Sequence, residues 1–242
     1  MMPVLLFAVA SLLASTDANR EGFAAYQKGQ LALANKLFHK AVQQDPKNAY
    51  AWLNLARTTS RRLGDTEPKD PCALAHNWVY LSLAYLDRAM QLDAAAIGPK
   101  LADDTTGLAH LKKREEFAAW QLAVQPLPKG DAAIRSFLQQ HNFFWASVGV
   151  LEGLTLEKDG TARYGIPGSE APIGAWAVVK GAVEIRKGEK LARRYRLTVQ
   201  PWAFGEGKYS YRRVVLEQDG TQEGPDLLEY GPMMDCGDGG EL

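Results

Sequence analysis

A pattern of small residues that starts again after 34 positions constrains the first half of this chain more than any other feature. Gly22, Ala34 and Ala41 would let two antiparallel helices approach closely, and Phe38 would fill the gap between them. The pattern begins again at Ala56, which stands where Gly22 stood one period earlier. The sequence therefore predicts helical hairpins that follow one another along the chain.

The same stretch carries the signature of a known family. Trp52 and Leu55 precede Ala56 in a W-x-x-L-small arrangement, and the period is that of the tetratricopeptide repeat. Residues 19–121 resemble a tetratricopeptide repeat (TPR) protein of bacterial type, with one full unit, the first helix of a second and a degenerate closing repeat. The resemblance implies a TPR-like helical domain over residues 19–125 that binds another protein or peptide.

Hydrophobic spacing and helix-stop signals place the expected helices. Asp45-Pro46 closes the second of them, and a polar loop with Pro68 and Pro71 separates the third from the fourth. The loop is longer than the short turn of the family, which places the regularity of the stack in question. The expected helices are Asn19–Lys28, Leu31–Gln44, Ala49–Leu63, Ala73–Leu92 and the closing element Lys100–Trp120.

The resemblance also implies a binding surface, because the first helix of each unit lines a concave face in this family. Aromatic side chains beside asparagine and arginine suit an extended peptide. Phe23 stands where recognition of a C-terminal carboxylate would require asparagine, so that particular ligand is excluded. The alternative, that this face packs against the second domain, stays open. The partner-binding residues that the resemblance implies are Asn19, Phe23, Tyr26, Gln27, Tyr50, Asn54, Arg57 and Arg61.

The second half of the chain has a different pattern. Pro126, Pro128 and Gly130 break the helical pattern, and Asp131 is expected to cap a short helix that ends at Gln140. Beyond His141 the apolar residues alternate, and tight turns recur at Asp159-Gly160, Lys180-Gly181 and Asp219-Gly220. We therefore expect an α+β protein in which residues 131–242 form a small antiparallel β-barrel or bent β-sheet with a leading helix and a flexible tail. The expected strands are Val148–Leu156, Thr161–Tyr164, Gly174–Val179, Ala182–Arg186, Ala192–Val199 and Tyr209–Leu216.

A strand, an Asp-Gly-Thr turn and the segment IGAWAVVKGAVEIR follow one another in this half. This order of elements resembles that of small lipocalin-like barrels over residues 145–217. The resemblance implies that an apolar small molecule could bind inside the barrel. The aromatic side chains could line such a cavity or could equally fill it as a core. The residues concerned are Trp145, Trp176, Tyr195, Trp202, Tyr209 and Tyr211.

No arrangement of residues with catalytic or metal-binding spacing occurs. The histidines His39, His76, His110 and His141 are scattered, and neither a nucleophile elbow nor a phosphate-binding loop is present. Lysine plus arginine and aspartate plus glutamate both number 28, so the basic surface that nucleic-acid binding requires is not expected. We expect a non-catalytic scaffolding protein without cofactor or metal. Strand arginines near residues 193–196 and 212–213 are expected to pair with Glu184 and Glu217.

The first eighteen residues are typical of an export signal. The apolar run at residues 3–14 is too short to span a bilayer, and Thr16-Asp17-Ala18 resembles a cleavage site. A buried first helix is the alternative. Cleavage near Ala18 would place the protein in the periplasm or outside the cell, with no membrane span in the mature chain. In that oxidising setting Cys72 and Cys236 could form a disulfide or remain two free thiols.

Overall fold

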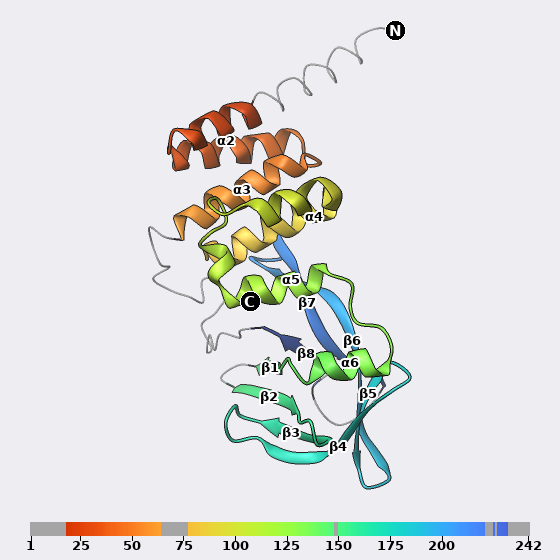
Figure 1. The fold of residues 1–242 in the computed structure, drawn as a ribbon. Coiled ribbons are helices and arrows are strands. Elements are labelled where there is room, and N and C mark those ends of the chain that lie inside the picture. Colours follow the sequence, from red (N-terminus) through yellow and green to blue (C-terminus); the bar gives the residue numbers. More distant parts are fainter. Residues whose placement is uncertain (1–17, 64–76, 148–149, 221–224, 226, 232–242) are drawn as a thin grey trace, which may run out of the picture. The chain divides into compact units, whose positions relative to one another are not determined.

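The computed structural model describes residues 18–63, 77–147, 150–220, 225 and 227–231 (Figure 1). Residues 1–17 of the expected signal segment, Cys72 and Cys236 lie outside the described residues. Two compact units make up the chain. The helical unit comprises Met1–Arg114 together with Phe204–Tyr211, and the β unit comprises Glu115–Ala203 and Arg212–Leu242. The division after Arg114 comes earlier than the proline-rich boundary that the sequence indicated.

The helical unit opens with a helix over residues 18–27. It continues with α2 (Leu31–Gln44), α3 (Ala49–Arg62), α4 (Trp78–Asp103) and the short 3-10 helix η2 (Leu111–Lys113). Helix α3 packs against both α2 and α4. The Asn48 side chain accepts a hydrogen bond from the Ala51 N–H at 3.0 Å, and the Asn77 side chain accepts one from the Val79 N–H at 2.9 Å. Both asparagines thus satisfy backbone donors at the start of a helix.

The residues that the sequence placed between the first two helices are buried. Ala34, Phe38 and Ala41 are all fully buried. A Cβ atom added at Gly22 would lie 2.7 Å from the Phe38 ring, well inside van der Waals contact. Glycine at this position is therefore what permits the first helix to lie against Phe38.

Helix α4 is divided by a kink at Asp93, with φ −156° and ψ 79°. Its first part ends at Leu92, as predicted, and a second helical part that was not predicted follows the kink and ends at Asp103. The Asp93 carboxylate accepts the Ala96 N–H at 3.0 Å, which caps the second part. The predicted helix Lys100–Trp120 is wrong as a single element. Lys100 belongs to α4, residues 104–114 form turns and η2, and a separate helix follows in the β unit.

The β unit contains α5 (Glu115–Val124), α6 (Asp131–Leu138) and eight antiparallel strands, so the α+β class is confirmed. Each strand pairs with its neighbour in the chain, and β1 also pairs with β8, so the strand order closes on itself. Two of the strands, β1 and β8, were not predicted. The strands are β1 (Phe143–Ser147), β2 (Val150–Leu156), β3 (Thr161–Gly165), β4 (Ala171–Val179), β5 (Ala182–Lys187), β6 (Lys190–Phe204), β7 (Tyr209–Gln218) and β8 (Leu227–Tyr230).

The turn between β4 and β5 is held by a residue of α6. Lys180 and Gly181 both have positive φ, 52° and 79°, as the expected two-residue hairpin turn requires. Asp131 accepts their backbone N–H groups at 3.1 Å and 2.8 Å. The predicted role of Asp131 as an N-cap is therefore wrong: Gly130 precedes the first turn of α6, and the Asp131 carboxylate serves the β4–β5 turn instead.

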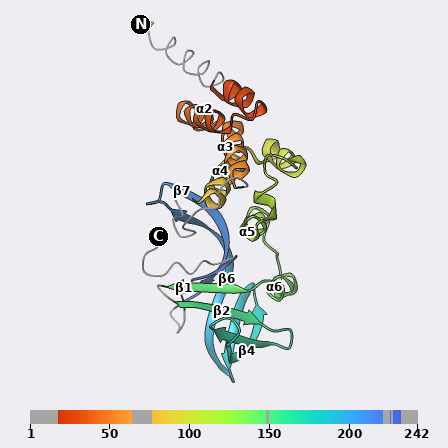
Figure 2. The same ribbon diagram turned by 90° about the vertical axis from the view of Figure 1, so that its left-hand side faces the viewer.

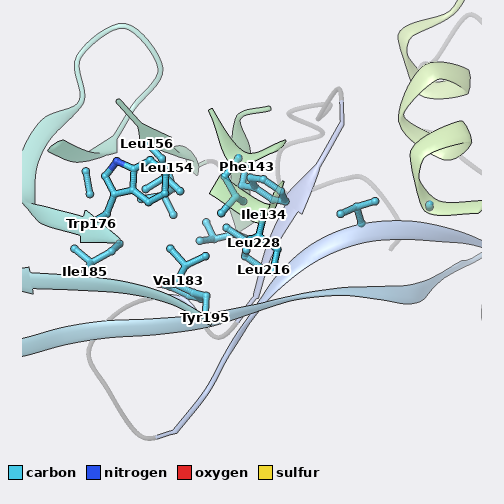
Figure 3. Packing of buried hydrophobic residues seen from close by; sticks show 14 residues of the cluster. Ile134, Phe143, Leu154, Leu156, Trp176, Val183, Ile185, Tyr195, Leu216 and Leu228 are labelled. Carbon is cyan, nitrogen blue, oxygen red and sulfur yellow. The ribbon is translucent and has the colours of Figure 1, made fainter. Parts of the chain in front are cut away.

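The interior of the β unit is a continuous apolar core (Figure 3). Side chains from α6 and from different strands of the sheet point toward one another in this cluster (Figure 3). Phe143, Val183, Ile185, Tyr195 and Leu216 are fully buried in it.

The hairpin of β6 and β7 contributes to both units. These are the longest strands, and their curvature is visible in Figure 2. The tip, Phe204–Tyr211, belongs to the helical unit. There the Tyr80 ring of α4 lies 6.2 Å from the ring of Phe204 and 6.2 Å from that of Tyr211. The tip thus completes the aromatic packing around α4.

Candidate functional site

The helical unit contains an open groove with a volume of about 780 Å³. We call it the helical groove. Three segments form it: the helix over residues 18–27, the first half of α3 with its cap, and the end of α4 with the turn that follows. Its lining residues are Asn19, Arg20, Phe23, Tyr26, Asn48, Tyr50, Asn54, Arg57, Lys100, Asp103, Asp104, Thr105 and Thr106.

The structure brings most of the predicted partner-binding residues together in this groove. Six of the eight line it: Asn19, Phe23, Tyr26, Tyr50, Asn54 and Arg57. Gln27 and Arg61 are not among the lining residues, although the Arg61 guanidinium lies 5.2 Å from the centre of the Tyr26 ring.

One side of the helical groove, formed by residues between Lys100 and Thr106, was not predicted from the sequence. Those residues were assigned to the start of a new helix, whereas they form the end of α4 and the turn after it. The predicted helix end at Leu92 located the kink at Asp93, but the helical part that leads from there to Lys100 was not predicted.

A chain of polar side chains forms the floor of the groove. The Asn54 amide donates to Asn19 Oδ1 at 3.2 Å, and Arg57 Nη1 donates to Asn54 Oδ1 at 3.2 Å. Arg57 Nε also donates to Asp104 Oδ2 at 2.5 Å. Because Asn54 is almost fully buried, each of these bonds satisfies a group that water reaches poorly.

Asp104 anchors this network. Its other oxygen accepts the backbone N–H groups of Thr106, Gly107 and Leu108 at 3.2, 2.7 and 3.2 Å. Burial by itself would raise the pKa of Asp104. The hydrogen bond and charge of Arg57, with the N–H groups of Leu108 and Gly107, outweigh burial and hold that pKa below its ordinary value. The carboxylate therefore stays ionised and fixes Arg57.

Exposed aromatic rings line the sides of the groove. Phe23 and Tyr50 keep 42% and 43% of their surface accessible, which is high for side chains of this size. Phe23 stacks on Tyr26 with ring centres 6.3 Å apart, and the Lys100 ammonium lies 5.4 Å from the centre of the Tyr50 ring. Two accessible aromatic surfaces thus flank a polar floor, an arrangement that suits an extended chain with both side-chain and backbone groups to satisfy.

The aromatic residues singled out in the second half of the chain have different roles. Trp176 and Tyr195 belong to the core of the β unit, and Trp176 Nε1 donates to the Glu157 carbonyl at 2.9 Å. Tyr209 and Tyr211 lie in the hairpin tip of the helical unit. The side chain of Trp145 lies outside the described residues.

The arginines of the strands pair mainly with carboxylates. Arg194 and Arg196 both approach Asp219, at 3.3 Å and 3.0 Å, and Arg194 also lies 4.0 Å from Glu184. Arg213 forms an ion pair with Glu229. The expected pairing is therefore seen at Glu184, while the other carboxylates are Asp219 and Glu229 where Glu217 was expected.

A comparison of the chain with family models, with curated proteins and with solved structures found no match. Among the residues that the structure describes, no group of histidine, cysteine and carboxylate side chains is placed to hold a metal ion. None of the helices in the same residues is both long and apolar enough to cross a membrane.

Proposed function

We propose that this chain is an exported, non-catalytic scaffolding protein of the cell envelope whose helical groove binds an extended segment of another protein. The helical unit in this proposal is a small array of tetratricopeptide-like hairpins, and the expected signal segment is removed on export to the periplasm or beyond. The observation that carries the proposal is the meeting of six sequence-selected residues in one groove. Its exposed rings and ordered amides are groups that peptide recognition uses.

Site-specific photo-crosslinking in the native envelope tests this function. A photoreactive phenylalanine analogue at Phe23 or Tyr50 places the reactive group inside the groove. The same analogue at Leu33, which is 48% exposed on α2 and does not line the groove, is the matched control. We expect one and the same protein adduct from both groove positions and none from Leu33. Equal labelling from all three positions contradicts the proposal.

A double substitution provides the binding test. Phe23→Ala with Tyr50→Ala removes exposed rings and leaves the Arg57–Asp104 network intact, so the fold is retained. Truncation of two contact aromatics costs about 2–4 kcal/mol of binding. We therefore expect the double variant to lose the partner, first identified by crosslinking, in an affinity pull-down. Unchanged recovery with a purified partner would reject the groove as its binding site.

The second candidate function is binding of an apolar small molecule by a lipocalin-like barrel in the β unit. The closed strand order favours it, since such a barrel needs closure. The side chains that fill the interior oppose it. Titration of the folded protein with a hydrophobic dye tests this second function. Saturable, stoichiometric binding supports the carrier, and no binding removes it.

A further inference from the structure

A second concavity of the helical unit shares no residue with the helical groove. Its volume is about 490 Å³, and α2, α3, α4 and the tip of the β6–β7 hairpin all contribute to it. We call it the aromatic pocket. The lining residues that matter here are His39, Trp52, Tyr85, Arg88, Lys208 and Tyr209.

Three aromatic rings gather around Tyr85 in this pocket. The centre of the Tyr85 ring lies 5.8 Å from that of Trp52, 5.8 Å from that of His39 and 6.0 Å from that of Tyr209. Trp52 Nε1 donates to the Pro46 carbonyl at 3.0 Å, so the only donor of the indole is already used. What the indole can offer a ligand is its aromatic surface.

Packing within the protein holds the aromatic side chains of this pocket in place. Tyr209 stacks on Phe204 with ring centres 5.5 Å apart, and Phe204 is buried against Tyr80 of α4. Tyr85 is itself almost fully buried. A pocket with preformed walls loses little conformational freedom when it binds, which favours a small ligand.

The charged side chains that line the pocket, among the residues that the structure describes, are both cations. They are Arg88 and Lys208, both exposed, and no aspartate or glutamate of the described residues is in the lining. Burial, followed by the positive charge of Lys208, lowers the pKa of His39, so the imidazole is neutral near pH 7. The neighbouring Asp87 is buried outside the pocket lining and accepts a hydrogen bond from Gln91 at 2.7 Å.

We propose that the aromatic pocket binds a small aromatic carboxylate, with its ring among Trp52, Tyr85 and Tyr209 and its carboxylate facing Arg88 and Lys208. Aromatic walls select the ring, and cations without a competing carboxylate select the anion. The volume falls in the range of about 300–1,000 Å³ that small-molecule sites occupy. None of the described side chains lines both this pocket and the helical groove, so the two proposals are tested by different substitutions.

Calorimetric titration of the full chain with two matched probes tests the proposal. The probes are 2-naphthoate and 2-naphthalenemethanol, which have the same ring system and differ in charge. We expect the full chain to bind 2-naphthoate about tenfold more tightly than the alcohol, since a charge-assisted hydrogen bond adds about that much. Equal affinity for both probes, or binding of neither, overturns the proposal.

Three substitutions locate the site. Arg88→Gln and Lys208→Gln remove the two cations, and each is expected to weaken 2-naphthoate binding by about threefold to tenfold while leaving the alcohol unaffected. Lys40→Gln makes the same charge change on an exposed part of α2 outside the pocket, and is expected to change neither affinity. All three positions are exposed, so the variants fold. Loss of binding in Lys40→Gln equal to that in Arg88→Gln would overturn the assignment to this pocket.

Discussion

Two helical glycines with contrasting surroundings show how a single methyl group can act on this fold. Gly22→Ala places a carbon 2.7 Å from the buried Phe38 ring, whereas, apart from the helix itself, nothing lies within 4 Å of a Cβ at Gly98 in α4. We expect Gly22→Ala to destabilise the protein by about 1–3 kcal/mol through overpacking. At Gly98 the gain in helix propensity is opposed by crowding between the new Cβ and the ring of Pro99, so Gly98→Ala should change stability by less than about 1 kcal/mol. Urea denaturation of both variants measures the difference.

The pair is informative because alanine improves helix propensity at both positions. A stabilised Gly22→Ala protein would show that the first helix does not lie against Phe38. That result would remove the hairpin packing on which the helical groove depends.

The Asp104 carboxylate predicts a dependence of stability on acid. Its folded-state pKa lies below its ordinary value of 3.8, so it stabilises the fold in full above that value. The contribution is lost as pH falls through the folded-state pKa, because the carboxyl is then protonated in both states. Asp104→Asn should cost about 1–2 kcal/mol at neutral pH, and the difference from the unsubstituted protein should shrink below pH 3.8.

Chemical denaturation at neutral and acid pH measures this effect. Asp103→Asn is the matched control, because Asp103 is the neighbouring carboxylate and is exposed. We expect that variant to change stability by less than about 0.5 kcal/mol at either pH. Equal effects of the two substitutions would contradict the assigned role of Asp104.

At the residue scale, the sequence predicted contacts between residues of one hairpin. It missed contacts between residues that are far apart in the chain. Phe38 and its small neighbours lie in one hairpin, so their spacing identified them. Asp104 meets Arg57 across a separation of 47 residues, and Asp131 meets Gly181 across 50. Local preference assigned Asp131 to a helix cap, but two backbone N–H groups of the distant turn bind it more favourably.

At the scale of elements, predictions were most accurate where a periodic pattern was long. The predicted bounds of α2 agree with the structure, and α3 ends within one residue of its prediction. Strand β8 has only four residues, too few for alternation to show. Strand β1 is a run of aromatic and small residues, which read as packing next to His141. The predicted end at Leu92 coincides with the kink of α4, whereas the helical segment between Asp93 and Asp103 was not predicted.

The hydrogen bonds between Asp131 of α6 and the β4–β5 turn can be tested by substitution of Asp131. Asp131→Ala removes both acceptors of the Lys180 and Gly181 N–H groups, and Asp131→Asn keeps one oxygen. We expect losses of about 1–2 kcal/mol for alanine and about half of that for asparagine. Amide hydrogen exchange should accelerate at Lys180 and Gly181.

An unrelated turn supplies the internal reference for that measurement. The Thr161 N–H bonds to Asp159 at 2.8 Å, and its exchange should not change in either variant. Faster exchange at all three amides would indicate global destabilisation and would reject a local link.

At the scale of the whole molecule, the β6–β7 hairpin is divided between the two units. Its strands belong to the β unit, while its tip supplies Phe204 and Tyr211 to the helical unit. Partition of one hairpin between two cores has no local sequence signature, since it follows from which aromatic faces remain uncovered on α4. The sequence therefore indicated two successive domains, and the structure has one hairpin that serves both.

Phe204→Ala is the prediction that follows at this scale. Phe204 is 1% exposed, and its removal should cost about 3–5 kcal/mol. The effect should appear in the helical unit, as faster amide hydrogen exchange along α4, although Phe204 itself ends a β-strand. Ile166→Ala, at a 62% exposed position, should leave α4 unchanged. Unaltered exchange of α4 in Phe204→Ala would contradict the assignment of the tip.

The order of synthesis gives this hairpin a consequence for the nascent chain. Tyr80 and Tyr85 leave the ribosome long before the segment that covers them, because Phe204–Tyr211 lies beyond most of the β unit. Until that segment emerges, two aromatic faces of α4 stay open to unintended association. A chain truncated before Phe204 would keep these faces of α4 uncovered and should therefore be a substrate for chaperones and proteases.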